Sequence, residues 1–231
     1  MGDADVRVRH VTDGSGPPIR DAATVIVLRD GETGPRVLMG QRGAGAAFMA
    51  SKYVFPGGAV EPGDAATTFA RPLDPATRRA LSRRGTASPE ALAAAALREL
   101  AEETGQIAGR AYGDGPGPVC DWPGFAGLAP DAGVLRFVFR AVTPPGRKRR
   151  FDARFFLMPA EALAGDPDDF SAAEDELGHL HWVPLAEARD LDLPFVTEVA
   201  LAEVAAIVAG AEQPGVPFFD NSGAGSVFER L

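Results

Sequence analysis

Two short stretches constrain what this chain can fold into more than any other feature. A Gly-rich turn at residues 55–64 reads FPGGAVEPGD, and an acidic segment at residues 96–105 reads ALRELAEETG. In a helix, residues three and four apart share a face, so Glu99, Glu102 and Glu103 lie on one side. Such crowded carboxylates repel each other unless a divalent cation binds them. Mg²⁺ prefers oxygen ligands and completes its shell with water and phosphates, so the pattern predicts a Mg²⁺ site, with Mn²⁺ as an alternative.

The residues around these carboxylates fit the same interpretation. Arg98 precedes Glu102 by four positions and can brace its carboxylate, while Leu97 and Leu100 supply an apolar face for the core. Gly105 suits the left-handed residue that follows a helix. The glycines of the turn let backbone groups approach a ligand closely.

Together the two stretches resemble the signature of the Nudix hydrolases. Gly58 matches the first glycine of that signature, and its second half is matched by Arg98, Glu99, Leu100, Glu102, Glu103 and Gly105. Three departures stand out. Asp64 replaces a glutamate, Gln106 replaces an apolar residue, and 33 residues (65–97) separate the two halves where the signature has 7.

An expanded signature of this kind resembles one branch of the family, the coenzyme A and acyl-CoA diphosphatases. The segments 41–58 and 150–157 resemble that branch as well. The resemblance implies an α/β/α sandwich with a mixed sheet. It also implies hydrolysis of CoA or acyl-CoA to 3′,5′-ADP and a 4′-phosphopantetheine.

The resemblance also implies roles for individual residues. Glu99, Glu102 and Glu103 are the expected metal ligands, together with the Gly57 carbonyl, and Arg98 is expected to hold the cluster in place. Substrate contacts are expected from Gly58, Arg42, Arg150 and Arg154.

The general base is left open between two places. Glu99 can act through a metal-bound water, whereas many family members use a carboxylate from a late loop that precedes a strand with a tryptophan. Here that loop contains Glu174 and Glu176, ahead of Trp182, and we favour Glu176 over Glu174.

The insertion between the two halves is itself rich in arginine. Arg78, Arg79 and Arg83 fit a lid beside the Gly-rich turn that holds a phosphate outside the scissile diphosphate, as arginine suits phosphate geometrically. The loop at 147–150 is a rival for this role, and a solvated helical hairpin is the plainer interpretation.

Two other functions compete with a CoA diphosphatase. One is a Nudix pyrophosphatase for ADP-ribose, a dinucleotide or an oxidised nucleotide, and the other is a non-catalytic Nudix module that only binds ligand. The intact set of Arg98, Glu99, Glu102 and Glu103 argues against the non-catalytic module.

Composition narrows the partners. The formal net charge of −9 argues against nucleic acid, and no apolar run approaches the ~18 residues of a membrane helix. The single Cys120 fits a reducing compartment, and the N-terminus has no signal-peptide pattern, so we expect a cytoplasmic protein. A small nucleotide or CoA-type substrate is the expected partner, and a homodimer is left open.

The pattern of apolar runs and turn residues predicts one domain at 21–231 after an N-terminal arm at 1–20. We expect a short strand at 6–8 in the arm. Asp74-Pro75 and Ser88-Pro89 are each typical of the start of a helix, and Gly85 is expected to end the first of these two helices. Further strands are expected at 23–28, 36–41, 134–142, 151–158 and 177–183, and helices at 89–104, 184–189 and 198–209. Residues 111–133 are rich in Gly and Pro and are expected to be irregular, and the tail from 214 is rich in Gly, Pro and Phe. In the last helix Val199, Val204 and Ile207 are expected to face inward.

Overall fold

The computed structural model describes residues 16–111, 120–223 and 225–231. Its centre is a mixed sheet of nine strands in the order β11-β10-β7-β8-β1-β2-β3, with β4 paired to β1 and β9 paired to β2. The strands of this sheet are β1 (Ile19–Arg29), β2 (Arg36–Arg42), β3 (Tyr53–Val54), β4 (Gly57–Ala59), β7 (Arg136–Val142), β8 (Arg150–Pro159), β9 (Leu177–Pro184), β10 (Pro217–Asp220) and β11 (Val227–Arg230). β1 runs parallel to β8, and β10 runs parallel to β7.

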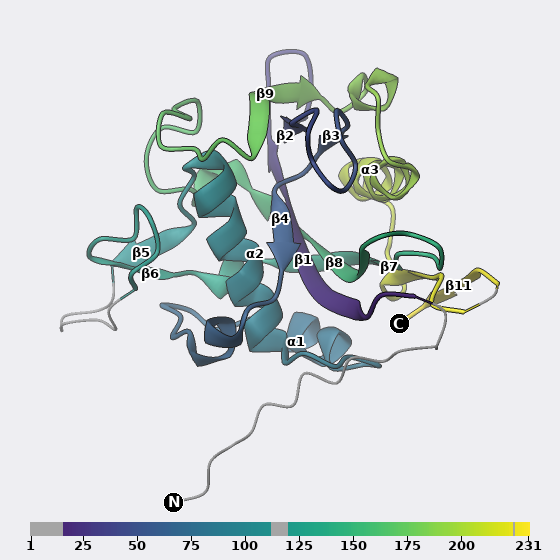
Figure 1. The fold of residues 1–231 in the computed structure, drawn as a ribbon. Helices are drawn as coiled ribbons and strands as arrows, with labels where there is room; N and C mark the ends of the chain where they lie inside the picture. Colours follow the sequence, from purple (N-terminus) through teal and green to yellow (C-terminus); the bar gives the residue numbers. More distant parts are fainter. Residues whose placement is uncertain (1–15, 112–119, 224) are drawn as a thin grey trace, which may run out of the picture.

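Helices cover both faces of this sheet. In Figure 1, α2 (Pro89–Thr104) lies on one side and α3 (Phe195–Val208) on the other. The α2 side buries a cluster that includes Val25, Leu97 and Phe156, and the α3 side buries one that includes Ile26, Phe155 and Leu201. Alternate residues of β1 and β8 therefore enter opposite cores, as the two-residue period of a strand requires. The predicted α/β/α sandwich is confirmed.

The insertion is helical, with the N-terminal caps of both helices where the sequence predicts them. Asp74 caps α1 (Pro75–Leu81), and the Ser88 hydroxyl accepts a hydrogen bond from Ala91 at the start of α2. The prediction for Gly85 was wrong, because α1 ends at Leu81 and the left-handed residue of the following turn is Arg84, with φ of 53°. α1 packs against β7 and is joined to α2 by an ion pair between Arg78 and Glu90.

Several elements depart from the sequence-based expectation. Residues 109–130 hold a two-stranded sheet, β5 (Gly109–Ala111) with β6 (Leu128–Pro130), and the tail contributes β10 and β11 to the main sheet. A short 3-10 helix at Ala188–Asp190 replaces the helix expected at 184–189, and others lie at Pro62–Ala66, Ala132–Val134 and Ala160–Ala162. In α3 Val204 is buried alongside Leu201, and the half-buried Val199 and Ile207 pack against the same apolar cluster, so all three face inward as predicted.

The N-terminal expectations are only partly covered. β1 begins at Ile19, inside the expected arm, and the strand predicted at 6–8 lies outside the described residues. In the part of the chain that the structure describes, no helix has both the length and the apolar character needed to cross a membrane.

Candidate active site

The two halves of the signature meet despite the 33 residues between them. α2 packs on β1 and β4, so the Gly57-Gly58 turn lies against the acidic face of the helix. The Gly57 amide donates a hydrogen bond to Glu103 Oε2 at 2.7 Å. A Cβ at Gly58 would lie 2.2 Å from Glu99 Oε1, so any side chain there would displace the Glu99 carboxylate. The turn needs glycine because of this close approach.

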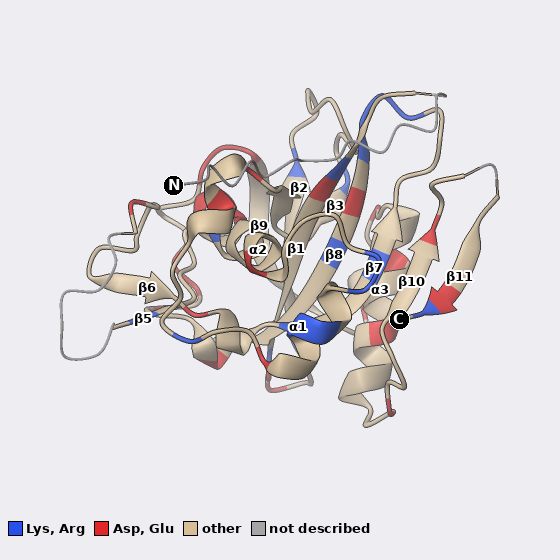
Figure 2. Ribbon diagram, turned by 90° about the horizontal axis from the view of Figure 1, so that it is seen from below, with Lys and Arg blue, Asp and Glu red and all other residues tan. Residues whose placement is uncertain are grey.

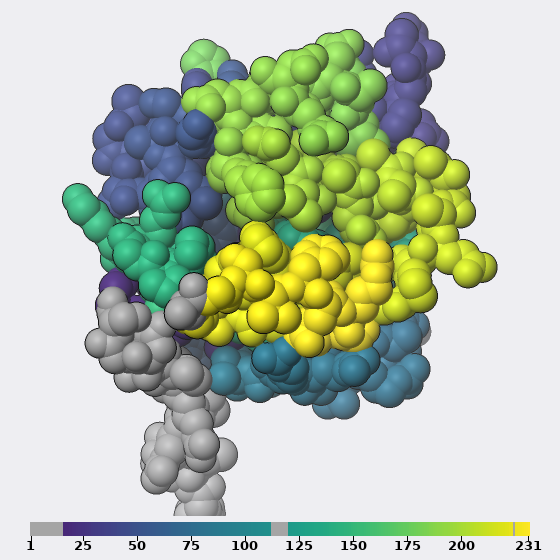
Figure 3. Space-filling view, turned by 90° about the vertical axis from the view of Figure 1, so that its right-hand side faces the viewer, coloured from purple at the N-terminus to yellow at the C-terminus, as the bar shows by residue number. Residues whose placement is uncertain are grey.

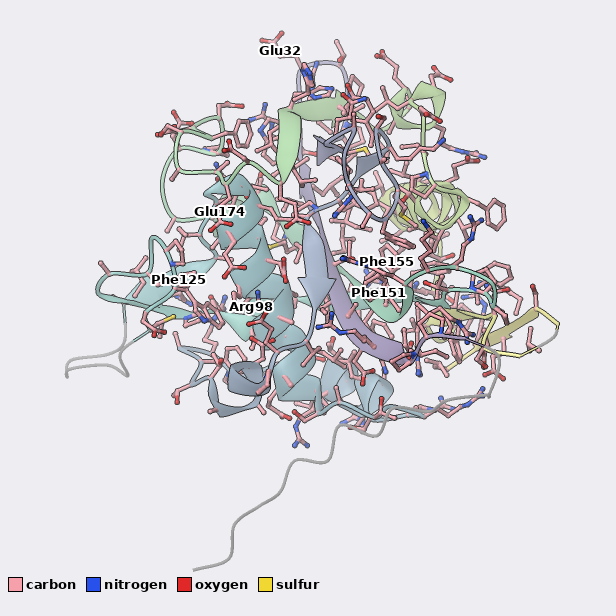
Figure 4. All side chains as sticks on the ribbon, viewed as in Figure 1. Glu32, Arg98, Phe125, Phe151, Phe155 and Glu174 are labelled. Carbon is pink, nitrogen blue, oxygen red and sulfur yellow. The ribbon has the colours of Figure 1, made fainter. Side chains whose placement is uncertain are left out.

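Arg98 is the organising cation of the site. Its Nη1 donates to Glu99 Oε1 at 3.0 Å and to Glu102 Oε2 at 2.8 Å, which confirms the predicted brace. Burial lowers the pKa of the guanidinium, but its hydrogen bond to Asp64 and the charges of Glu99, Asp64 and Glu102 raise the pKa by more, so the net shift is upward. Figure 4 shows Arg98 on α2, facing the turn.

Asp64 holds Arg98 from the other side, a role that the sequence analysis missed. The buried Asp64 carboxylate accepts from Arg98 Nε at 3.1 Å and from Nη2 at 3.3 Å. It also accepts from the Glu61 amide at 2.7 Å, which fixes its rotamer. The departure of Asp64 from the family pattern was the available signal. The shorter carboxylate still reaches Arg98.

Glu103 is the most deeply buried of the three helix carboxylates. It is 2 % exposed, and its Oε1 is buried without a hydrogen-bond partner in the described structure. Burial raises the pKa of Glu103 to about 8, against the hydrogen bond from Gly57 and with help from the charges of Glu99 and Glu176. Burial likewise raises the pKa of Glu99 to about 7, although Arg98 opposes the shift. Burial also raises the pKa of Glu102.

These carboxylates suit a divalent cation in their chemistry but are not preassembled around one. Within the described ranges, no group of three or more His, Cys, Asp or Glu side chains converges in a metal-binding arrangement. Arg98 instead occupies one oxygen each of Glu99 and Glu102. The partnerless oxygen of Glu103, beside two acids with raised pKa values, is where the donor set fits a hard cation.

The late loop does reach the site. The Glu174 amide donates to the carbonyl of Glu102 at 2.9 Å, so the loop is attached to the C-terminal end of α2, as Figure 4 shows. Glu176 Oε1 accepts from Arg42 Nη2 at 2.7 Å, and Arg42 Nη1 lies 4.0 Å from Glu103 Oε1. Arg42 thus lies between the two acids, and its Nε is buried without a partner. Glu174, Glu176 and Arg42 are all brought to the carboxylate site.

Other predicted substrate residues are not brought there. Arg78 is paired with Glu90, about 14 Å along the helix axis from Glu99 at ~1.5 Å per residue. α1 packs on β7, and the phosphate-binding role of Arg78, Arg79 and Arg83 stays a prediction. The spacing of arginines in a sequence indicates which of them share a helix face, but it does not indicate which strand the helix will pack against.

Arg150 and Arg154 are also unlike their prediction, because each is only 1 % exposed. Arg150 donates to the carbonyls of Thr143 and Ser222, and Arg154 pairs with Asp21 and Asp152. Arg140 completes this second network with a double hydrogen bond to Asp152 at 2.8 and 2.6 Å. Bands of opposite charge cross β1, β8 and β7 in Figure 2. These buried arginines stabilise the sheet and have almost no surface to offer a substrate.

The fold and the site define an α/β protein with a carboxylate-rich site where a Gly-rich turn meets a helix. Neither the protein-family models nor the curated proteins gave a match. Among solved structures, the chain is similar to a Nudix hydrolase from Alicyclobacillus acidocaldarius, with 32% identity over 83% of this chain and 91% of that chain and a TM-score of 0.59. The chain therefore belongs to the Nudix hydrolases.

Other solved structures match at lower identity and lower TM-score. An Ap4A hydrolase from C. elegans matches at 15% identity with a TM-score of 0.49, over 83% of this chain and 99% of that chain. The Nudix domain of NrtR from Shewanella oneidensis, crystallised with ADP ribose, matches at 13% identity with a TM-score of 0.46, over 86% and 94% of the two chains.

Proposed function

We propose that this protein hydrolyses a diphosphate linkage in a nucleoside diphosphate derivative and requires a divalent cation. The observation that carries the proposal is Glu103, a buried carboxylate with a partnerless oxygen next to Glu99 and to the Gly57 amide. If Glu103 had only a structural role, its unbonded oxygen would lower the stability of the fold, because a buried acceptor without a hydrogen bond is destabilising. A cation that binds phosphate oxygens would satisfy it.

The residues divide the work as follows. Glu99, Glu102 and Glu103 would hold Mg²⁺ or Mn²⁺, with Gly57 at the edge of the site, and Arg98 and Asp64 keep Glu99 and Glu102 in position. When bound, the cation neutralises charge that develops on the phosphate oxygens. Glu176 takes a proton of the water whose oxygen bonds to one phosphorus, the bond from that phosphorus to the bridging oxygen breaks, and the bridging oxygen leaves with the second phosphate. Arg42, which contacts Glu176, lies where it can turn toward a phosphate.

For the substrate we propose CoA or acyl-CoA, which would give 3′,5′-ADP and a 4′-phosphopantetheine. The support is that segments 41–58 and 150–157, together with the 33-residue insertion, resemble the coenzyme A and acyl-CoA diphosphatases. ADP-ribose, dinucleotides and oxidised nucleotides are the alternative substrates.

A panel of CoA, dephospho-CoA, acetyl-CoA, ADP-ribose and Ap4A, incubated with Mg²⁺, Mn²⁺ or EDTA, tests this function. We expect 3′,5′-ADP from CoA in the presence of Mg²⁺ and no product in EDTA. Release of 5′-AMP from ADP-ribose with no turnover of CoA would select the alternative substrate class. The absence of any cation-dependent product would leave a module that only binds its ligand.

A further inference from the structure

A pair of aromatic side chains lies outside the cores of the protein. Phe48, from the loop between β2 and β3, and Phe151, at the start of β8, have ring centroids 5.3 Å apart at an interplanar angle of 67°. Both rings are half-buried, and neither belongs to any of the three apolar clusters found in the described residues. The pair therefore offers aromatic surface to something other than the core.

The loop that presents Phe48 is held in an unusual conformation. Met49 and Ser51 have φ of 55° and 61°, a region that residues other than glycine seldom adopt. Hydrogen bonds close the loop at its base, from the Arg42 amide to the Lys52 carbonyl at 3.0 Å and from the Ser51 amide to the Arg42 carbonyl at 3.1 Å. Arg42 thus joins the base of this loop to the carboxylate site.

A basic loop follows β7 and ends two residues before Phe151. Arg147, Lys148 and Arg149 are exposed and form no ion pair within the described ranges, although the chain carries a net charge of −9. Pro144 and Pro145 restrict the backbone of the loop. Its base is fixed by hydrogen bonds between Thr143 and Phe151, at 2.8 and 3.1 Å. Three cations are therefore carried on a well-anchored loop.

This aromatic and basic region lies within reach of the carboxylate site. Phe151 is paired with Arg20 and Gly58 with Ala23, so two strand spacings of ~4.8 Å and three residues of ~3.3 Å separate the backbones of Phe151 and Gly58, about 14 Å in the plane of the sheet. Phe151 shares a sheet face with Phe155, on the side away from α2, as Figure 4 shows. In Figure 3 the segments near residues 50 and 145 lie side by side on the surface. The separation is of the order of a nucleoside diphosphate.

We propose that Phe48 and Phe151 bind the base of a nucleotide and that Arg147, Lys148 and Arg149 bind a phosphate that it carries outside the scissile diphosphate. This subsite rests on the proposed function, since its nucleotide is the one whose diphosphate reaches Glu103. Flat aromatic surface suits a base, and unpaired cations suit a dianionic phosphate. The selectivity for a 3′-phosphorylated nucleotide thus comes from the β7–β8 loop and not from α1.

Equilibrium titration of the full chain with 3′,5′-ADP and with 5′-AMP tests the subsite without turnover. Phe48→Ala and Phe151→Ala should each raise the Kd of both nucleotides by about tenfold, through lost stacking. Arg147→Ser/Lys148→Ser/Arg149→Ser should raise the Kd of 3′,5′-ADP by about tenfold and that of 5′-AMP by no more than about twofold. Phe48→Leu controls for loop packing, because it keeps apolar bulk but not the aromatic face.

A matched variant removes the same charge elsewhere. Arg110→Ser/Arg136→Ser/Arg189→Ser should leave the ratio of the two Kd values unchanged. Equal weakening of both nucleotides by the loop variant would overturn the phosphate site, and unchanged binding in both phenylalanine variants would overturn the aromatic part.

The assay also separates this subsite from the proposed function. Turnover of CoA with binding that is indifferent to these variants would sink the subsite alone. Variant-sensitive binding of 3′,5′-ADP without cation-dependent hydrolysis of any substrate would sink the proposed function alone.

Discussion

Two buried networks of arginines and carboxylates lie in this protein, and they differ in their charge balance. The sheet network consists of Arg140 and Arg154 with Asp21 and Asp152, two cations against two anions. The second network lies at the family signature, and we call it the box network. It consists of two cations and five carboxyls: Arg42, Arg98, Asp64, Glu99, Glu102, Glu103 and Glu176. Each network leaves a buried terminal atom without a hydrogen bond, Arg154 Nη2 in the first and Glu103 Oε1 in the second. Arg154 Nη2 still lies 3.2 Å from Asp152, whereas the cation nearest to Glu103 Oε1 in the network is Arg42 at 4.0 Å. The difference separates an ionic network that supports the fold from one that is suited to a further cation.

The largest effect is expected from the sheet network. Asp152→Ala leaves Arg140 and Arg154, which are 4 % and 1 % exposed, without their shared anion. We expect a loss of about 3–5 kcal/mol in the free energy of unfolding, measured by urea denaturation, because an unpaired buried charge is costly.

A surface pair supplies the control. Asp168→Ala removes the partner of Arg29 at a carboxylate that is 60% exposed, and should cost less than about 1 kcal/mol. A similarly small cost for Asp152→Ala would mean that the sheet network does not support the fold.

The box network should respond in the opposite way. Glu102→Gln and Glu103→Gln should each lower kcat at saturating Mg²⁺ by at least ~10²-fold, since a ligand is lost where charge develops in the transition state. Thermal unfolding in EDTA should show the fold intact, and for Glu103→Gln a Tm at or above that of the wild type. Near-normal turnover in both variants would remove the metal-ligand assignment.

These contrasts show what the sequence could and could not predict. Asp74, Ser88 and Gly105 act on backbone groups a few residues away, so the starts of α1 and α2 and the end of α2 were predictable. The pairing of Gly58 with Glu99 was predictable only through the family signature. The burial of Arg154 depends on Asp21, 133 positions away, and β10 joins β7 through the tertiary fold. Local pattern contains no trace of such contacts, and for the same reason the pairing of Phe48 with Phe151 was missed.

The loop carboxylate should have a smaller effect than the helix carboxylates. Glu176→Gln should lower kcat by roughly 10- to 50-fold, below the usual contribution of a general base, with KM changed by less than about threefold. A base acts in the transition state, so kcat should change more than KM. Glu174→Gln is the control on the same loop. A silent Glu176→Gln together with an inactive Glu99→Gln would move the base into the signature helix.

The smallest expected effect is the pH dependence of stability in EDTA. The box network should make the free energy of unfolding fall as pH rises. The pKa values of Glu99 and Glu103 are raised to about 7 and about 8 in the folded protein, above the 4.5 of an unperturbed glutamate. Between these values the folded state binds more protons than the unfolded state. Stability should therefore be greatest below about pH 4.5 with respect to these two groups, and should fall as pH rises toward 8. We expect the free energy of unfolding to decrease between pH 6 and pH 8, measured by urea denaturation at each pH. Excess Mg²⁺ should restore the loss at pH 8, and the Glu99→Gln/Glu103→Gln variant should lose most of the slope. An equal slope in that variant would place its origin outside the box network.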